Sequence, residues 1–149
     1  MLIVNFYSKT KFDSPRQKFN KLVKFICGRF GVSIAVINIS ITDNRQIRAF
    51  NKKFHHRNAV TDCLSFDLSH PADKCKTFDI IVNAQKAKSE AKKRGHPPQA
   101  ELALYITHGL LHNLGFNDHS AKQAKLMHQT EDEILQKQDF GKVHDRHSR

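Results

Sequence analysis

Residues 106–120 read ITHGLLHNLGFNDHS, and the rest of the fold can be organised around this stretch. His108 and His112 lie four residues apart, so on a helix their imidazoles share one face, about one turn apart. Gly115 can adopt the left-handed conformation that ends a helix and turns the chain back. The spacing predicts a helix that presents two imidazoles near its end, with the remaining chain as its scaffold.

A third candidate ligand follows the predicted turn. Asp118 and His119 are neighbours there, and either one could come back to face the two imidazoles. Three such side chains plus water make an open metal site of the catalytic type. Zn²⁺ suits this imidazole-rich, water-open set, and Ni²⁺ or Co²⁺ would also fit. We therefore expect one metal ion, bound by His108, His112 and either Asp118 or His119.

The residue after the first histidine helps to decide which class of metal hydrolase the sequence fits. In the H-E-x-x-H metallopeptidases that position is a glutamate that acts as the general base. Here it is Gly109. A peptidase-like zinc hydrolase is therefore only an alternative hypothesis.

Outward from this stretch, the apolar pattern predicts four strands and five helices in the order β-α-β-α-β-β-α-α-α. Strands are expected at 2–6, 32–41, 61–68 and 78–82, and the last two can form a hairpin. Helices are expected from Pro15 to before Gly31, after Thr42 or Asp43, at 84–94, at about 99–114 and after Ser120. This order indicates an α+β (α/β-like) fold with one mixed, mostly four-stranded sheet. We expect a single domain over 1–149 with a polar, frayed tail at about 140–149.

The second expected helix has a capping residue and an apolar face of its own. Thr42 or Asp43 can cap its start. Ile47, Phe50 and Phe54 recur at helical spacing after it and are expected to point inward.

The net charge indicates the kind of partner, and the cysteines indicate the redox compartment. The net charge of +11 favours a polyanionic partner, nucleic acid before anionic membrane. Cys27, Cys63 and Cys75 are odd in number and show no CxxC spacing, which is typical of reduced thiols in the cytosol. No stretch approaches the roughly 20 apolar residues of a membrane span. We expect a cytoplasmic protein that binds nucleic acid and no membrane.

Several blocks of the chain resemble the YbeY family of single-domain, metal-dependent endoribonucleases. They are HGLLHNLGFNDH at 108–119, TDCLSFDL at 61–68 after FNKKFHHRNAV, FDIIVNAQKAKSEAKKRG at 78–95 before ELALYITHG, and MHQTEDEIL at 127–135. The resemblance implies RNA cleavage in ribosomal RNA maturation and ribosome quality control, with ribosomal RNA or subunits as partners. A non-catalytic ribosome-assembly factor with a structural metal is the other alternative hypothesis.

This chain departs from the family pattern at two site positions. The usual third histidine stands ten positions after the first, where this chain has Asp118; a one-residue bulge would bring His119 there instead. The position of the usual functional arginine holds His55, and Arg57 follows two residues later. We expect Arg57 to stabilise phosphate charge and His55 to carry a proton.

Basic residues on two of the expected helices are predicted to contact RNA phosphates. These are Arg45, Arg48, Lys52, Lys53, Lys86, Lys92, Lys93 and Arg94. Such contacts position RNA without reading its sequence and make binding weaken steeply with salt. The nucleophile, water or the RNA 2′-hydroxyl, stays open at this level.

Overall fold

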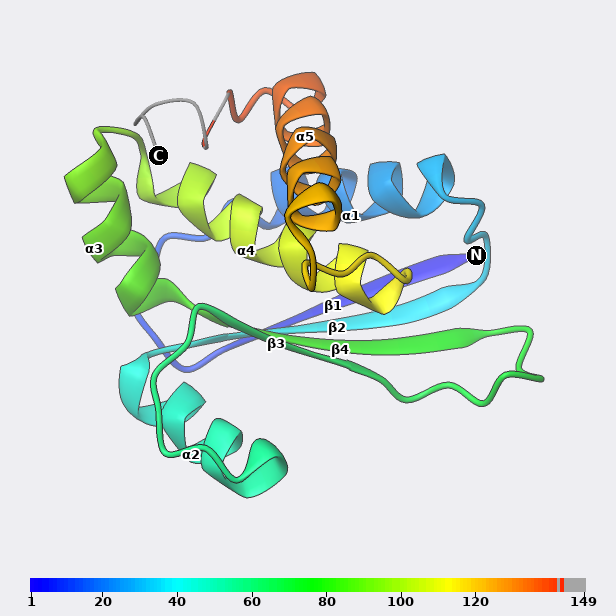
Figure 1. Cartoon of the computed structure of the whole chain (residues 1–149), viewed down its shortest axis with the longest axis horizontal. Coiled ribbons are helices and arrows are strands. Elements are labelled where there is room, and N and C mark those ends of the chain that lie inside the picture. Colours follow the sequence, from blue (N-terminus) through cyan, green and yellow to red (C-terminus); the bar gives the residue numbers. More distant parts are fainter. Residues whose placement is uncertain (142, 144–149) are drawn as a thin grey trace.

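The computed structural model describes residues 1–141 and 143, and its element order is the predicted one (Figure 1). The strands are β1 (Leu2–Ser8), β2 (Ala35–Thr42), β3 (Cys63–Asp67) and β4 (Lys76–Asn83). The helices are α1 (Arg16–Arg29), α2 (Asn44–His55), α3 (Ala84–Arg94), α4 (Pro98–Asn113) and α5 (Ala121–Lys137).

The four strands form one mixed sheet in the order β1-β2-β4-β3. β1, β2 and β4 are parallel, whereas β3 pairs antiparallel with β4, as the predicted hairpin requires. The prediction of an α+β fold with one mixed four-stranded sheet is confirmed.

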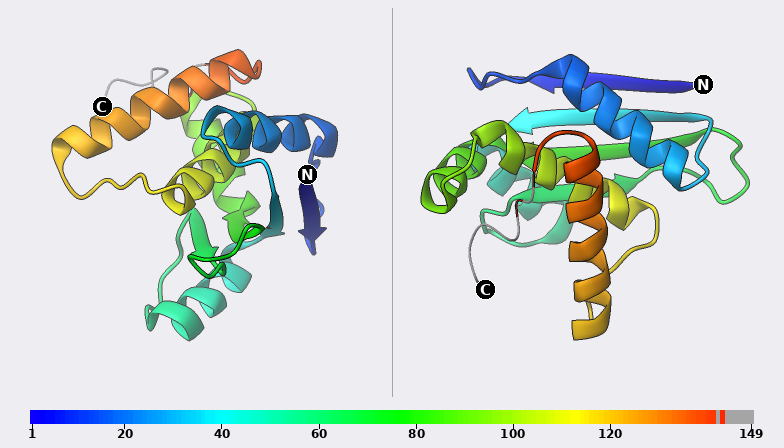
Figure 2. Two further views of the ribbon diagram at one scale, coloured as in Figure 1. Left: turned by 90° about the vertical axis from the view of Figure 1, so that its right-hand side faces the viewer. Right: turned by 90° about the horizontal axis from the view of Figure 1, so that it is seen from above.

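The two faces of the sheet are covered unequally. Alternate residues of a strand point to opposite faces. Ile37, Ile39 and Ile80 belong to the main core beneath α1 and α4, whereas Leu64 and Ile81 pack with α2 on the other side. Figure 1 and the left view of Figure 2 show α2 across the sheet from α1, α4 and α5.

The predicted N-terminal cap of α2 is confirmed, but two of the aromatic side chains on this helix are exposed. Asp43 caps the helix, accepting from the Gln46 amide at 2.8 Å while the Gln46 side chain accepts from the Asp43 amide. The inward orientation expected for Phe50 and Phe54 is wrong: they are 36% and 50% exposed. The reason is that α2 covers only a corner of the sheet, and Ile47 fills the small apolar contact there.

α4 runs through the centre of the helical layer and is buried on almost every side. It lies over β3 and β4 and contacts α1, α3 and α5. Eleven of its residues, from Ala100 to Leu111, are buried. Its surroundings therefore hold the helix end that carries the two histidines.

Three further expectations concern the whole chain. Within the described residues, no helix is long and apolar enough to cross a membrane. The three cysteines are free, as predicted, and burial raises the pKa of the Cys27 thiol to about 11.

The structure describes part of the polar tail expected at 140–149. Phe140 is buried, and its ring stacks on Phe19 with the ring centroids 6.0 Å apart. Residues 142 and 144–149 lie outside the described part.

Candidate metal centre

The end of α4 brings two imidazoles together. His108 and His112 belong to successive turns, and their Nε2 atoms lie 3.0 Å apart. The rings meet nearly at right angles, with centroids 4.5 Å apart and 84° between the planes. Both side chains are partly buried, so one edge of the pair is open to solvent.

The Nδ1 atoms of the two rings are both engaged elsewhere. His112 Nδ1 donates to the backbone carbonyl of Phe116 at 3.0 Å, and His108 Nδ1 donates to Glu131 Oε2 at 2.9 Å. A neutral imidazole that donates from Nδ1 has a bare lone pair at Nε2. Two such lone pairs facing each other repel, and a cation between them removes the repulsion. The arrangement therefore fits a metal ion on the Nε2 side.

A carboxylate joins the two imidazoles from the turn after α4. Gly115 has a φ of +101°, and the Phe116 amide donates back to the Leu111 carbonyl at 3.0 Å. This reversal brings Asp118 next to the histidines, so that one ligand atom from each of the three residues lies within 4.8 Å of the others. Two nitrogens and one oxygen form a donor set that suits Zn²⁺ with an open position.

His119, the other candidate for the third position, is not in this group. Its side chain is exposed, and its backbone amide donates to Asn117 Oδ1 at 3.3 Å. Among the described residues, the group that could hold a metal ion is therefore the one expected without a bulge.

Glu131 is a site residue that the sequence alone did not reveal. It lies on α5, is 0% exposed, and accepts the His108 Nδ1 proton. A carboxylate on the inward face of a helix is uncommon unless it has a partner. That rule was the available signal, since Glu131 falls in the buried stripe with Met127 and Ile134.

The surroundings change the proton affinity of His108. Burial alone lowers the pKa of this imidazole. The hydrogen bond and the charge of Glu131, followed by the charges of Asp62 and Asp118, outweigh burial and raise the pKa above its ordinary value. The centre therefore attracts positive charge, whether a proton or a metal ion.

Gly109 allows α4 to lie directly against the sheet. A Cβ atom at this position would come within 2.7 Å of Cys63 Sγ and 3.0 Å of Ile80 Cγ2. A larger side chain, such as the glutamate of the metallopeptidases, would meet the same two strands. The absence of a glutamate at position 109 therefore allows α4 to pack closely against β3 and β4.

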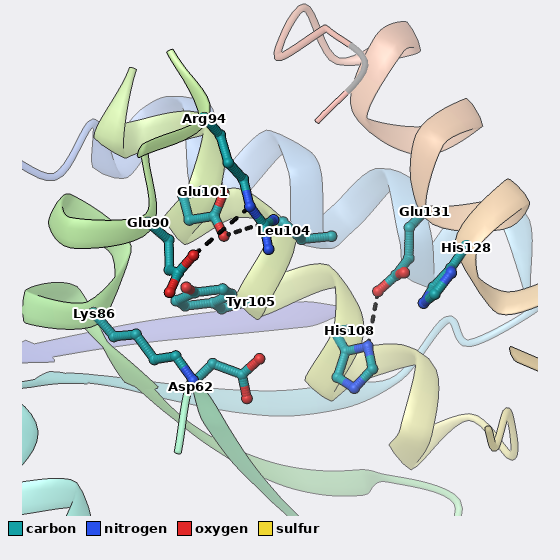
Figure 3. Close-up of a pocket in the computed structure, with 10 residues that line it drawn as sticks. All are labelled: Asp62, Lys86, Glu90, Arg94, Glu101, Leu104, Tyr105, His108, His128 and Glu131. Atoms are coloured by element: carbon teal, nitrogen blue, oxygen red, sulfur yellow. Dashed lines mark hydrogen bonds and ion pairs between the residues drawn. The ribbon is translucent and has the colours of Figure 1, made fainter. Parts of the chain in front are cut away.

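A pocket of about 200 Å³ adjoins the centre (Figure 3). It extends from His108 along the groove between α3 and α4. Its lining residues are Asp62, Lys86, Glu90, Arg94, Glu101, Leu104, Tyr105, His108, His128 and Glu131. The pocket therefore carries four carboxylates against one lysine and one arginine.

The far end of this pocket is a network of ion pairs. Arg94 lies 3.3 Å from Glu101 and 3.7 Å from Glu90, and the buried His96 lies 3.0 Å from Glu101. Burial, and then the nearby carboxylates, raise the pKa of Tyr105, so the phenol keeps its proton. Arg94 is thus held by protein carboxylates.

His55 and Arg57 lie on the α2 side of the sheet. The His55 ring stacks on Phe66 at 5.5 Å, and Phe66 packs with the cluster beneath α2. Arg57 is exposed on the loop that follows α2, and its backbone amide donates to the Asn51 carbonyl. The described contacts do not join either side chain to His108, so their catalytic roles stay predictions.

Comparisons with known proteins agree with the resemblance. A family model described as endoribonuclease YbeY matches residues 3–139. An endoribonuclease YbeY of Carboxydothermus hydrogenoformans is 32% identical over 108 residues, covering 72% of this chain and 73% of that protein. One from Sulfurovum sp. (strain NBC37-1) is 39% identical over 110 residues, covering 70% and 72%. The solution structure of a Thermotoga maritima protein matches the fold with a TM-score of 0.62, 17% identity and 96% coverage of both chains. This chain belongs to the endoribonuclease YbeY family.

Proposed function

We propose that this protein is a metal-dependent endoribonuclease in which His108, His112 and Asp118 hold one divalent ion, with Zn²⁺ the best suited. One observation carries the proposal: the Nε2 atoms of His108 and His112 lie 3.0 Å apart, and one ligand atom from each of His108, His112 and Asp118 lies within 4.8 Å of the others. Family membership supports cleavage of RNA.

The chain's own residues would prepare the site for this chemistry. An ion held there would supply Lewis acidity to a phosphoryl oxygen. Glu131 and the Phe116 carbonyl keep the His108 and His112 protons on Nδ1 and so keep both Nε2 atoms available. Asp118 is exposed, so a long polymer can approach the third ligand from solvent.

The substrate proposal rests on charge and on the family. A net charge of +11 attracts a polyanion. We propose ribosomal RNA, as a precursor or in subunits, as the substrate and the cytoplasm as the place of action, because the family resemblance implies both. The packing at Gly109 supports RNA over peptide as substrate, since it leaves no room for the peptidase base.

Arg57 and His55 are proposed to assist the reaction. Arg57 would stabilise charge on the phosphate, since a guanidinium binds phosphate through two parallel hydrogen bonds. His55 would carry a proton. His55 ends α2, and Arg57 lies on the loop that leads from α2 to Asp62 in the pocket beside His108, so RNA that follows this loop would meet both side chains.

A side-by-side assay tests the proposed function. Chelator-treated protein, with and without added Zn²⁺, is incubated with structured RNA and with casein. We expect RNA cleavage with metal and none without it, and no casein cleavage in either case. Casein cleavage would favour a peptidase-like hydrolase instead.

A ligand variant separates catalysis from assembly. His112→Ala should keep its circular dichroism spectrum and lose RNA cleavage, because it removes one of the two converging nitrogens. A folded His112→Ala protein that still cleaves RNA would contradict the proposal and favour an assembly factor whose metal is structural.

A further inference from the structure

The basic residues predicted to contact RNA phosphates lie on α2 and α3, and the structure gives the two groups different surroundings. Those on α3 lie among carboxylates: Lys93 lies 3.9 Å and Arg94 3.7 Å from Glu90, and Lys86 lines the acid-rich pocket. A polyanion therefore gains little attraction from the pocket beside the metal centre. Its affinity has to come from elsewhere on the protein.

α2 carries the other basic surface. We call it the α2 groove, a hollow of about 490 Å³ along the helix and the loop that follows it. It is lined by Asn44, Arg45, Arg48, Ala49, Lys52, Asn58, Val60 and Gln85. The lining contains three cations, three amides and no carboxylate, and α2 has no acidic residue along its length. Among the described ion pairs, Arg45, Arg48 and Lys52 take no part.

An aromatic pocket adjoins the α2 groove across the helix. It has a volume of about 290 Å³ and is lined by Tyr7, Lys9, Ser40, Ile41, Thr42, Gln46, Ala49 and Phe50. Ala49 lines both hollows, so they meet at this residue. Tyr7 is 56% and Phe50 36% exposed, so both rings offer apolar area to a ligand. This lining contains one lysine and again no carboxylate.

We propose that α2 and the adjoining end of β1 form a binding surface for single-stranded RNA, separate from the metal centre. Phosphates lie in the α2 groove, where two guanidiniums and an ammonium meet them. An unpaired base enters the aromatic pocket and stacks against Phe50 or Tyr7, as bases do on aromatic side chains. The choice of RNA as occupant rests on the proposed function and on this charge complementarity.

The two sites are connected around one corner of the molecule. Val60 and Gln85 line the α2 groove, and Asp62 and Lys86 line the pocket beside His108. The same two chain segments, 60–62 and 85–86, therefore border both hollows. α2 itself lies across the sheet from α4 (Figure 1). An RNA strand bound at α2 would thus reach the metal centre by passing segments 60–62 and 85–86.

The first test removes the cations of the α2 groove. Binding of a fluorescent single-stranded RNA to chelator-treated protein is measured over a range of salt concentrations, so that no cleavage occurs. Arg45→Gln, Arg48→Gln and Lys52→Gln are combined in one variant. Loss of three phosphate contacts should weaken binding about 50-fold at 0.15 M salt and reduce the slope of log K against log salt by about 2.

A matched control carries the same change in charge on α1. Arg16, Lys21 and Lys24 are exposed there, on the other face of the sheet, and are replaced by glutamine together. The control should keep its affinity within about twofold, because exposed charges farther away than the Debye length are screened. Equal losses in the two variants would overturn the proposal, since net charge alone would explain them. Unchanged RNA binding in the α2 variant would also overturn it and favour an acidic protein as the occupant.

The second test concerns the stacked base. Phe50→Ala should weaken binding of single-stranded RNA about tenfold and leave binding of an RNA duplex unchanged, because the bases of a duplex are already stacked. An equal loss for both RNAs, or no loss for either, would overturn the base-stacking part of the proposal. All these measurements are made without metal, so a protein that binds RNA at α2 but never cleaves it would contradict only the proposed function.

Discussion

Replacing Gly109 by alanine tests the close packing that places the candidate metal centre on the sheet. The new methyl group would lie 2.7 Å from Cys63 Sγ and 3.0 Å from Ile80 Cγ2, well inside the contact distance of about 3.5–4.0 Å. Overpacking of a core costs about 1–3 kcal/mol, while alanine recovers about 1 kcal/mol of helix propensity. The difference predicts that the free energy of unfolding of the metal-free protein falls by up to about 2 kcal/mol in urea denaturation.

Two further variants make this result specific. Gly28 lies in α1, and a Cβ atom added there would have no neighbour within 4 Å, so Gly28→Ala should stabilise the protein by about 0.5–1 kcal/mol. Cys63→Ala removes the sulfur that Gly109→Ala meets, so the double variant should show a coupling energy of about 1 kcal/mol. A stabilising Gly109→Ala, or the same loss with and without Cys63, would refute the reasoning.

Three other predictions concern the metal centre. Glu131→Gln should weaken metal binding about 10–100-fold in calorimetry, because the carboxylate that orients His108 is lost; unchanged affinity would contradict that role. Asp118→Ala should lose metal affinity whereas His119→Ala keeps it, and the reverse result would favour the bulged loop. The folded-state pKa of His108 is raised, so its contribution to the stability of metal-free protein is fully present below about pH 6.5 and is lost as the pH rises through the raised value. Denaturation from pH 6 to pH 9 should show this loss in the native protein and less of it in Glu131→Gln.

Local patterns predicted most of the secondary structure, because strand and helix periods are visible within a few residues. The segment expected as a strand at 32–41 contains most of β2, and Ser120 caps α5 as its sequence suggests. The strand order β1-β2-β4-β3 was not predicted beyond the hairpin. It depends on pairing between segments that are far apart in the chain, which periodicity does not report.

The prediction that Phe50 and Phe54 of α2 point inward was wrong for a different reason. Phe50 and Phe54 follow the same helical spacing as Ile47, so the sequence predicted one buried face. Spacing shows which residues share a face but not how much of that face a small contact can cover. α2 packs mainly against β3 and β4, and its aromatic rings stay exposed.

The candidate centre was predictable where its chemistry is local. His108, His112 and the turn at Gly115 are visible in one stretch, and register alone favoured Asp118. Glu131 was missed because its partner is 23 residues away on another helix. The contact with β3 that explains Gly109 is likewise long-range and needed the structure.

The most direct measurement of the central claim is a zinc titration of chelator-treated protein, followed by the imidazole nitrogen resonances. We predict saturation at one ion per chain, with the Nε2 signals of His108 and His112 changing together. The Nδ1 signals should remain those of protonated nitrogens bonded to Glu131 and the Phe116 carbonyl. Saturation without any change at the two Nε2 atoms, or binding through Nδ1, would contradict the proposed centre.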